Sequence, residues 1–268
     1  MTILRLGDVG ADVRELQRLL RERGAQLEMT GDFDAATLAA VRAAQARYGL
    51  VVDGIAGPKT LLALQRDTRQ PAHLSAADLQ RAADVLEVPL AAVRAVNEVE
   101  SRGSGFLADG RPVILFERHI MFRQLKVAGR DADALARQYP NLVNAARGGY
   151  AGGAAEHMRL ARAADIDEAC ALAAASWGLF QVMGYHWERL GYPSVQAFSA
   201  CMRDSEAAQL DAFVRFILAD PVLHKALKAR RWPTFASLYN GPAYRENLYD
   251  VKLARAFARY DAEEKEPA

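Results

Sequence analysis

Residues 93–106 read VRAVNEVESRGSGF, and the fold of the larger part of the chain can be predicted outward from this stretch. Apolar residues recur at three- to four-residue spacing through and just before it, at Leu90, Val93, Val96 and Val99. This spacing predicts a helix with one apolar stripe, which the following glycine-rich run brings to an end. From residue 75 onward the pattern is nearly all helical, broken only by the segment that starts at Glu100 and by RGGYAGGAA over residues 147–155, so we expect a mainly α domain.

Two glutamates near the end of this helix are predicted to face different directions. At about 100° per residue, Glu100 lies roughly 30° from the centre of the stripe, whereas Glu98 lies roughly 170° away and is expected to face water. A carboxyl group on the inward face loses solvation, which raises its pKa and suits it to act as a general acid near neutral pH. Glu100 is therefore a candidate catalytic acid. The alternative is a buried glutamate held in a structural ion pair by Arg102 or Arg118.

The chain of 268 residues divides at a polar segment, RDTRQPAHLS over residues 66–75, which is typical of a linker. An internal repeat precedes it: GDFDAATLAAVRAAQ starts at Gly31 and GIAGPKTLLALQ starts at Gly54. Each copy has a glycine turn, a short loop, a threonine and an apolar helix, and the helical pattern LGDVGADVRELQRLL lies ahead of both. Three parts are therefore expected: a three-helix bundle over residues 1–66, a linker over 67–75 and one mainly helical domain over 76–262.

The helical domain is predicted to begin at a capping signal, because Ser75 precedes an apolar helical pattern and Asp78 follows three residues later. Within this domain, RPVILFE over residues 111–117 is short, apolar and rich in β-branched residues. We expect a small β-hairpin there.

Two further segments carry candidate binding residues. ASWGLFQVMGYHW over residues 175–187 combines aromatic side chains with one amide, that of Gln181, and this combination suits a sugar. The alternative is that these aromatic side chains fill the core. In FASLYNGPAY, residues 235–244, the Asn-Gly-Pro turn places Tyr239 and Asn240 at the end of a helix, where they could line a cleft.

Charge and composition argue against two classes of partner. The formal net charge is +1, with 34 basic and 33 acidic residues, which disfavours nucleic acid and anionic membranes. No stretch approaches the roughly 20 apolar residues of a membrane span, and the N-terminus has no apolar run of signal-peptide length. We expect no membrane insertion, synthesis in the cytoplasm and a monomer. Action outside the membrane would then require another protein to let the chain out.

Together, Glu-Ser before a glycine-rich break, S-x-G-L-x-Q-x-M and the Tyr-Asn-Gly turn resemble the motif order of the lysozyme-like superfamily, which includes soluble lytic transglycosylases and goose-type lysozymes. In this chain Gly241 follows Asn240 directly, where the usual pattern has one residue between them. The run EVESRGSGFLADGRPVILFERHIMFRQL is closer to the C-terminal N-acetylmuramidase domain of modular bacteriophage endolysins. This resemblance covers about residues 76–262.

The resemblance implies a lysozyme-like α domain that cleaves the β-1,4 glycosidic bond between N-acetylmuramic acid and N-acetylglucosamine in peptidoglycan. It implies that Glu100, the glutamate before the serine, is the catalytic acid, in agreement with its predicted position on the helix. It also implies a set of residues that line the substrate cleft: Ser176, Gln181, Tyr239 and Asn240.

A second carboxylate completes the chemistry of most glycosidases. Glu117 is the leading candidate because it closes an apolar strand near the glycine-rich loop, and Asp109, in the ADGR turn, is the runner-up. Without a second carboxylate the substrate's own 6-hydroxyl could attack, and the enzyme would be a lytic transglycosylase. His119 has no histidine or cysteine at metal-ligand spacing, so we predict no metal site and no cofactor.

The N-terminal repeat resembles the three-helix peptidoglycan-binding domain of many wall hydrolases, most specifically in the stretch from Asp53 to Thr60. This resemblance implies bacterial peptidoglycan as the partner, with candidate contact residues in the two repeat loops: Asp32, Phe33, Asp53 and Gly54. The combination of domains implies an endolysin that acts on the wall of a Gram-negative host, in the periplasm, after another protein has opened the membrane. The alternative of a different class is a non-catalytic wall-binding phage component.

Overall fold

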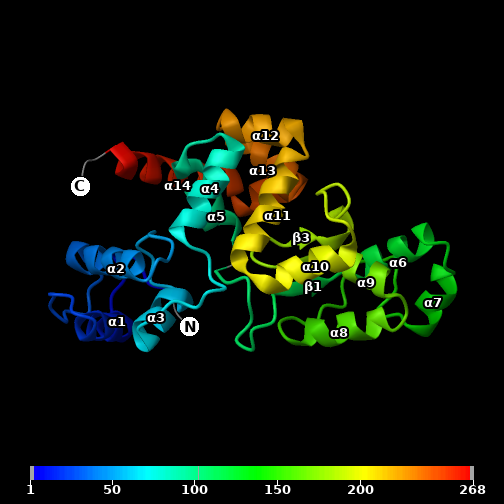
Figure 1. Cartoon of the computed structure of the whole chain (residues 1–268), viewed down its shortest axis with the longest axis horizontal. Helices are drawn as coiled ribbons and strands as arrows, with labels where there is room; N and C mark the ends of the chain where they lie inside the picture. Colours follow the sequence, from blue (N-terminus) through cyan, green and yellow to red (C-terminus); the bar gives the residue numbers. More distant parts are fainter. Residues whose placement is uncertain (1–2, 102, 266–268) are drawn as a thin grey trace. The chain divides into compact units, whose positions relative to one another are not determined.

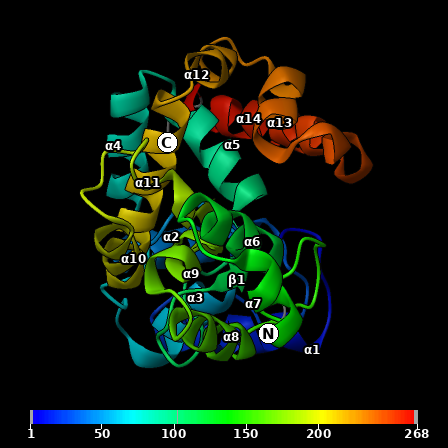
Figure 2. The same ribbon diagram turned by 90° about the vertical axis from the view of Figure 1, so that its right-hand side faces the viewer.

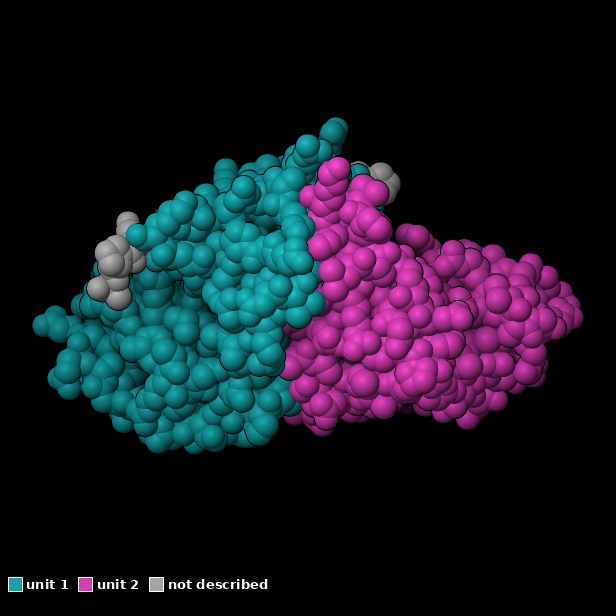
Figure 3. Space-filling model, turned by 45° about the horizontal axis from the view of Figure 1, so that its top comes forward, with its two compact units in different colours: residues 1–104, 226–268 teal, residues 105–225 magenta. Residues whose placement is uncertain are grey.

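The computed structural model describes residues 3–101 and 103–265. The chain forms two compact units, Met1–Ser104 with Ala226–Ala268, and Gly105–Lys225, which Figure 3 colours separately. Helices dominate both units, so the predicted mainly α fold is confirmed (Figures 1 and 2). The elements in chain order are α1 (Ala11–Glu22), α2 (Ala35–Arg47), α3 (Pro58–Arg66), α4 (Ala76–Leu86), α5 (Leu90–Glu100), β1 (Ile114–Phe116), α6 (Arg118–Val127), α7 (Ala132–Gln138), α8 (Ala155–Ala164), α9 (Glu168–Ala173), β2 (Ala175–Trp177), β3 (Val182–Met183), η1 (Gly184–His186), α10 (Val195–Asp204), α11 (Glu206–Leu218), α12 (Pro221–Lys228), α13 (Trp232–Asn240), η2 (Pro242–Asn247) and α14 (Tyr249–Lys265).

Helices α1, α2 and α3 form the predicted three-helix bundle around a core of their own. Helix α2 begins at Asp34, whose side chain accepts a hydrogen bond from the Thr37 backbone N–H at 2.8 Å. Helix α3 begins after Gly57 with a proline in its first turn, where the missing N–H costs nothing. The apolar stripes of the three helices supply most of the buried core, including Leu16, Leu20, Val41 and Leu64.

A buried glutamine closes the first repeat loop. Gln17, on α1, is fully buried, and its Nε2 donates to the Asp32 carbonyl and to Thr37 Oγ1, both at 3.0 Å. Its Oε1 accepts from the Gly31 N–H at 2.9 Å. The amide therefore ties α1 to both Gly31 and Asp32 of the loop and to Thr37 of α2.

The second repeat uses the same device. Gln45, on α2, is 1% exposed, and its Nε2 donates to the Ile55 carbonyl at 3.1 Å and to Thr60 Oγ1 at 3.2 Å. Its Oε1 accepts from the Gly54 N–H at 2.9 Å. The glycine and the threonine of each sequence repeat thus occupy equivalent places, and the repeat predicted from the sequence is also a repeat of hydrogen bonds.

Helix α5 packs between α4 and α14 in the first unit (Figure 2). The predicted capping box at the start of α4 is present, with the Ser75 N–H donating to Asp78 Oδ2 at 2.8 Å. Small residues at the α5–α14 contact, such as Ala91 and Ala95, allow the two helices to approach closely around the buried ring of Tyr260. This packing fixes the position of the α5 end that carries Glu98 and Glu100.

The second unit holds a three-stranded antiparallel sheet in the order β1-β2-β3. The predicted strand forms at residues 114–116, within a small antiparallel sheet. Strand β1 pairs with β2, so that Phe116 lies opposite Ala175, and the hairpin of the sheet is β2–β3, built from ASWGLFQVM. Just before β1 the chain also folds back on itself: the Leu107 N–H donates to the Arg111 carbonyl at 2.7 Å and the Val113 N–H donates to the Gly105 carbonyl at 2.8 Å, on either side of the bridge from Phe106 to Pro112.

Two glycines of the sequence motifs make room for one side chain. Gln209, on α11, is 1% exposed; its Oε1 accepts from the Leu179 N–H at 2.7 Å and its Nε2 donates to the Met202 carbonyl at 2.9 Å. A methyl group built on Gly105 would lie 2.0 Å from Gln209 Oε1, and one on Gly178 would lie 2.4 Å from Gln209 Cδ. Gly178 also has φ of +72°. Glycine is therefore required at both positions.

The domain boundaries predicted from the sequence, 1–66, 67–75 and 76–262, stay a prediction. By contacts within the chain, helices α13 and α14 belong to the same compact unit as α1 to α5. No helix among the described residues is long and apolar enough to span a bilayer.

Candidate active site

Glu100 is the last residue of α5 and is half-buried. Burial raises the pKa of its carboxyl to about 7, and this effect outweighs the hydrogen bond from Asn240 and the charge of Lys252, both of which lower it. The Asn240 Nδ2 donates to Glu100 Oε1 at 2.9 Å. A carboxyl group that is protonated near neutral pH and held by one donor has the properties of a general acid.

Glu98 does not face water, so that part of the helical-wheel prediction is wrong. Its Oε2 accepts a hydrogen bond from the Tyr260 hydroxyl at 2.5 Å and forms an ion pair with Arg259, and its side chain is only 24% exposed. Both partners come from α14, which covers this side of α5. The position of Glu98 is therefore set by packing between helices rather than by the stripe of its own helix.

The alternative role of Glu100 as the partner of a structural arginine receives no support from Arg118. The Arg118 guanidinium donates to the Ala146 carbonyl through Nε and to the Arg147 carbonyl through Nη2, each at 2.9 Å. It therefore anchors the loop before the RGGY segment. Arg102, the other arginine considered, lies outside the described residues.

Asn240 reaches Glu100 because α13 ends at this residue. The next residue, Gly241, has φ of +79°, a backbone conformation that glycine adopts without strain. Tyr239, one residue earlier, has its ring stacked on Phe235 with centroids 6.0 Å apart. The direct Asn-Gly sequence, in which this chain departs from the usual superfamily pattern, is thus compatible with an asparagine side chain directed at the carboxyl.

Asn240→Ala is expected to move the alkaline limb of the pH–activity profile to higher pH. The hydrogen bond from Asn240 favours the charged carboxylate, so its loss raises the pKa of Glu100 further and keeps the acid protonated to higher pH. The measurement is the rate of wall cleavage across a pH series, with exposed Asn247→Ala as the matched control. An alkaline limb that stays in place or moves to lower pH contradicts the assignment.

Glu117 lies between β1 and α6 in the second unit and is held by two side chains. The Tyr150 hydroxyl donates to Glu117 Oε2 at 2.8 Å, and His119 Nδ1 lies 3.1 Å from the same oxygen. Burial and the hydrogen bond to Glu117 raise the pKa of Tyr150, so its phenol stays a donor. The glycine-rich RGGY segment, which the sequence suggests only as a break between helices, therefore orients a candidate carboxylate.

Asp109, the second choice for this carboxylate, is an exposed turn residue. It forms an ion pair with Arg111 at 2.6 Å, and the hydrogen bonds from Arg111 hold the pKa of its carboxyl below the ordinary range. These contacts within the turn account for the presence of an aspartate here.

Ser176 and Gln181 bond to each other across the β2–β3 hairpin. The Ser176 hydroxyl donates to Gln181 Oε1 at 2.9 Å, and the Gln181 Nε2 donates to the Gly178 carbonyl at 2.8 Å. Ser176 is 6% exposed, and Gln181 has φ of +52°. The predicted role of both residues in binding sugar stays a prediction, and both side chains already support the turn.

The four candidate wall-contact residues of the bundle differ in exposure. Asp32 is exposed and Asp53 is half-buried, with Asp53 Oδ1 accepting from Gln45 Nε2 at 2.7 Å. Phe33 is 1% exposed in the bundle core, and Gly54 is buried. The Phe33 ring fills the core of the bundle, and the contact of these four residues with peptidoglycan stays a prediction.

Sequence reasoning missed a buried carboxylate of the second unit with several hydrogen-bond partners, Glu156. It is fully buried at the start of α8 and accepts from the backbone N–H groups of Phe116, Ala151 and Gly152 at 3.1, 2.6 and 2.9 Å. It also pairs with Arg159 at 2.7 Å. The available signal was a glutamate in the first turn of a helix directly after a glycine-rich loop.

No group of three or more His, Cys, Asp or Glu side chains is arranged to hold a metal ion within residues 3–101 and 103–265.

The comparisons with known proteins agree with both resemblances inferred from the sequence. Residues 89–261 match the N-acetylmuramidase family, and residues 9–64 match a family described as a putative peptidoglycan binding domain. The crystal structure of a Burkholderia AP3 phage endolysin is similar over 97% of this chain and 100% of that chain, with 63% sequence identity and a TM-score of 0.93.

A curated relative matches a shorter stretch. The zinc D-Ala-D-Ala carboxypeptidase of Streptomyces albus G is 43% identical over 81 residues, which cover 28% of this chain and 32% of the relative. The chain thus spans about a third of the length of that relative. Because the muramidase match covers well over half of the sequence, the chain belongs to the N-acetylmuramidase family of glycoside hydrolases and carries a peptidoglycan-binding domain at its N-terminal end.

Proposed function

We propose that this protein is a phage endolysin that hydrolyses the β-1,4 bond between N-acetylmuramic acid and N-acetylglucosamine, with Glu100 as the general acid. The observation that carries the proposal is the half-buried carboxyl at the end of α5, whose pKa burial raises to about 7. Family membership supports the substrate, and the 63% identical phage endolysin supports the biological setting.

In the proposed reaction the protonated Glu100 donates to the glycosidic oxygen as the bond to the anomeric carbon breaks. The sugar that remains acquires oxocarbenium character, which a second carboxylate stabilises either as a nucleophile or as the base for water. Asn240 orients the acid through its hydrogen bond to Oε1 and stabilises the carboxylate that proton donation leaves behind.

We assign the second carboxylate to Glu117, because the Tyr150 hydroxyl donates to its Oε2 and His119 Nδ1 lies 3.1 Å from the same oxygen. The remaining candidates for sugar contact are Ser176, Gln181 and Tyr239. The S-x-G-L-x-Q-x-M motif would then act mainly through the shape of the β2–β3 turn, since the Gln181 amide is engaged within that turn.

The N-terminal bundle is proposed to hold the enzyme on peptidoglycan, with Asp32 and Asp53 as contact candidates in the repeat loops. We further propose that the protein acts as a monomer on the wall of a Gram-negative host during lysis. In this scheme it reaches the periplasm through a membrane lesion made by a second protein.

The test is the mass of the soluble products released from purified peptidoglycan. Hydrolysis predicts muropeptides that end in N-acetylmuramic acid and gain two hydrogens on borohydride reduction. Products lighter by one water that resist reduction would instead identify a lytic transglycosylase and remove the role of Glu117. Absence of soluble product, with wall binding retained, would leave only an anchoring function.

A further inference from the structure

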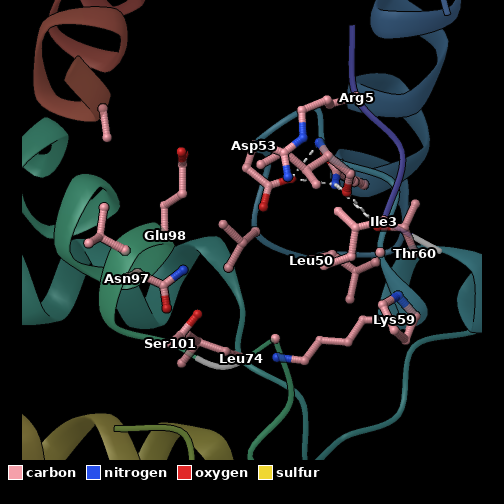
Figure 4. A pocket seen from close by; sticks show the side chains of 18 of the residues that line it. Ile3, Arg5, Leu50, Asp53, Lys59, Thr60, Leu74, Asn97, Glu98 and Ser101 are labelled. Carbon is pink, nitrogen blue, oxygen red and sulfur yellow. Dashed lines mark hydrogen bonds between the residues drawn. The ribbon is translucent and has the colours of Figure 1, made fainter. Parts of the chain in front are cut away.

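A cavity of about 500 Å³ lies within the first unit, between the repeat loops of the bundle and helices α5 and α14 (Figure 4). Its volume falls in the range of small-molecule sites, roughly 300–1,000 Å³. The wall on the bundle side includes Leu50, Asp53 and Lys59, and the opposite wall includes Asn97 and Glu98. Neither the general acid nor its asparagine partner is among the lining residues, so the cavity is distinct from the proposed catalytic site.

Polar contacts tie the two walls of this cavity together. Arg94, on α5, donates to the Val52 carbonyl of the bundle at 2.6 Å and lies 3.3 Å from the Glu263 carboxylate of α14. Its guanidinium also stacks on the Tyr260 ring, 4.0 Å from the centroid, and its side chain is only 14% exposed. Glu263 forms a second ion pair, with Arg42 of the bundle. Because Arg94 bonds to both the bundle and α14, it holds the two sides of the cavity together.

The cavity is lined by charged side chains of both signs. The carboxyl groups are those of Asp53 and Glu98, and Asp53 is sufficiently buried that desolvation raises its pKa. Figure 4 shows the Lys59 side chain, which like Asp53 belongs to the bundle side, extending towards Leu74. The α14 wall adds basic side chains, including Lys252 and Arg255. A ligand that fits would carry carboxylates and also a group that can donate to a carboxylate.

Asn97 adds an independent indication of a polar ligand. It lines the cavity from the last turn of α5, and its Oδ1 is fully buried with no hydrogen-bond partner among the described residues. Buried polar atoms almost always have a partner in folded proteins.

From this arrangement we propose that the cavity binds the stem peptide of peptidoglycan. Both the bundle and the helices α5 and α14 would then contact the substrate. The stem peptide has several carboxylates for Lys59, Lys252 and Arg255. In bacterial walls that contain diaminopimelic acid the stem peptide also has an ammonium group for Asp53, whereas Glu98 is already paired with Arg259. The proposal rests on peptidoglycan being the substrate, and it adds a second element of recognition beside the sugar chain.

Binding of a stem peptide in this cavity is expected to affect catalysis, because the cavity lies beside the end of α5 that carries Glu100. Asn97, Glu98 and Ser101 line the cavity from the same end of α5 that places Glu100 beside Asn240. A bound stem peptide would therefore brace the helix end that carries the acid. Muropeptide strands with intact stem peptides should be bound more tightly than bare glycan strands.

The experiment is isothermal titration calorimetry of the full-length protein with N-acetylglucosaminyl-N-acetylmuramyl tetrapeptide. This probe ends at N-acetylmuramic acid, so it lacks the bond on the reducing side of that sugar, which the enzyme would cut. Lys59→Glu and Arg255→Glu are each expected to weaken binding by about tenfold or more, as loss of a charge-assisted hydrogen bond predicts. Lys59 lies in the first turn of α3, where a glutamate suits the helix dipole, so this variant should fold. Exposed Lys225→Glu is the matched control.

The disaccharide without its peptide is the matched probe and should bind at least about tenfold more weakly. Equal binding of the two probes, or unchanged affinity in Lys59→Glu and Arg255→Glu, would overturn the proposal. Cleavage of whole peptidoglycan by the same preparations distinguishes failure of the cavity proposal from failure of the proposed muramidase activity. Cleavage without binding of the tetrapeptide probe contradicts the cavity proposal alone, whereas binding without cleavage contradicts the proposed activity alone.

Discussion

Replacing Glu100 with glutamine is expected to slow peptidoglycan cleavage by about 10²- to 10⁴-fold, the range that a general acid contributes. Glutamine keeps the size of the side chain and can still bond to Asn240, but it has no proton of suitable acidity to give to the leaving oxygen. The measurement is the initial rate of release of soluble muropeptides. Exposed Glu188→Gln is the matched control and should cleave at the wild-type rate.

A loss of activity in Glu100→Gln should not come from unfolding. The pKa of Glu100 is raised from 4.5 to about 7, so the protonated form is favoured in the folded state. The stability that this protonated carboxyl provides is present below pH 4.5 and is lost as the pH rises through 7. The uncharged glutamine avoids this loss, so the variant should melt at or above the wild-type temperature at pH values above 7. If Glu100→Gln cleaved peptidoglycan at the wild-type rate, another carboxyl group would have to be the general acid.

Glu156→Ala is expected to destabilise the protein by about 3–5 kcal/mol, the usual cost of removing one partner of a buried ion pair. The change would leave Arg159 and the N–H groups of Phe116, Ala151 and Gly152 without their shared acceptor. Phe116 precedes Glu117, and the loop that contains Ala151 and Gly152 also carries Tyr150. The variant should therefore also lose activity in the fraction that remains folded.

The free energy of unfolding in urea measures this effect, and two further variants calibrate it. Glu168→Ala removes an exposed glutamate from the first turn of α9 and should cost less than about 1 kcal/mol. Glu156→Gln keeps an acceptor oxygen and should fall between the two. A Glu156→Ala variant as stable as Glu168→Ala would show that the carboxylate is not needed to pin the loop.

Local patterns in the sequence were sufficient to predict the helices and the side of its helix on which Glu100 lies. Helical periodicity and capping depend on residues a few positions apart, which explains why the bundle and the Ser75 cap were predicted correctly. The inward position of Glu100 follows from the stripe of its own helix in the same way. Glu98 was predicted wrongly because its Tyr260 partner lies 162 positions away in the chain.

The other features that sequence patterns did not predict depend on contacts between segments far apart in the chain. The partner of β1 follows about 60 residues later, so the pairing of RPVILFE with ASWGLFQVM could not be found from either segment alone. Asn240 is separated from Glu100 by 140 positions, and only the resemblance to the lysozyme-like superfamily placed both in one site. The Tyr150 and Glu156 contacts depend on how the RGGYAGG loop folds back, and no periodicity encodes that.

The central claim is that Glu100 is the group whose proton is transferred, and titration of this one carboxyl tests it most directly. The protein would be labelled with ¹³C at the glutamate side-chain carbonyl, and the Glu100 resonance assigned by its absence in Glu100→Gln. The account predicts a midpoint at a pKa of about 7 that coincides with the alkaline limb of wall cleavage. A midpoint in the ordinary glutamate range, with cleavage unchanged across pH 7, would contradict it.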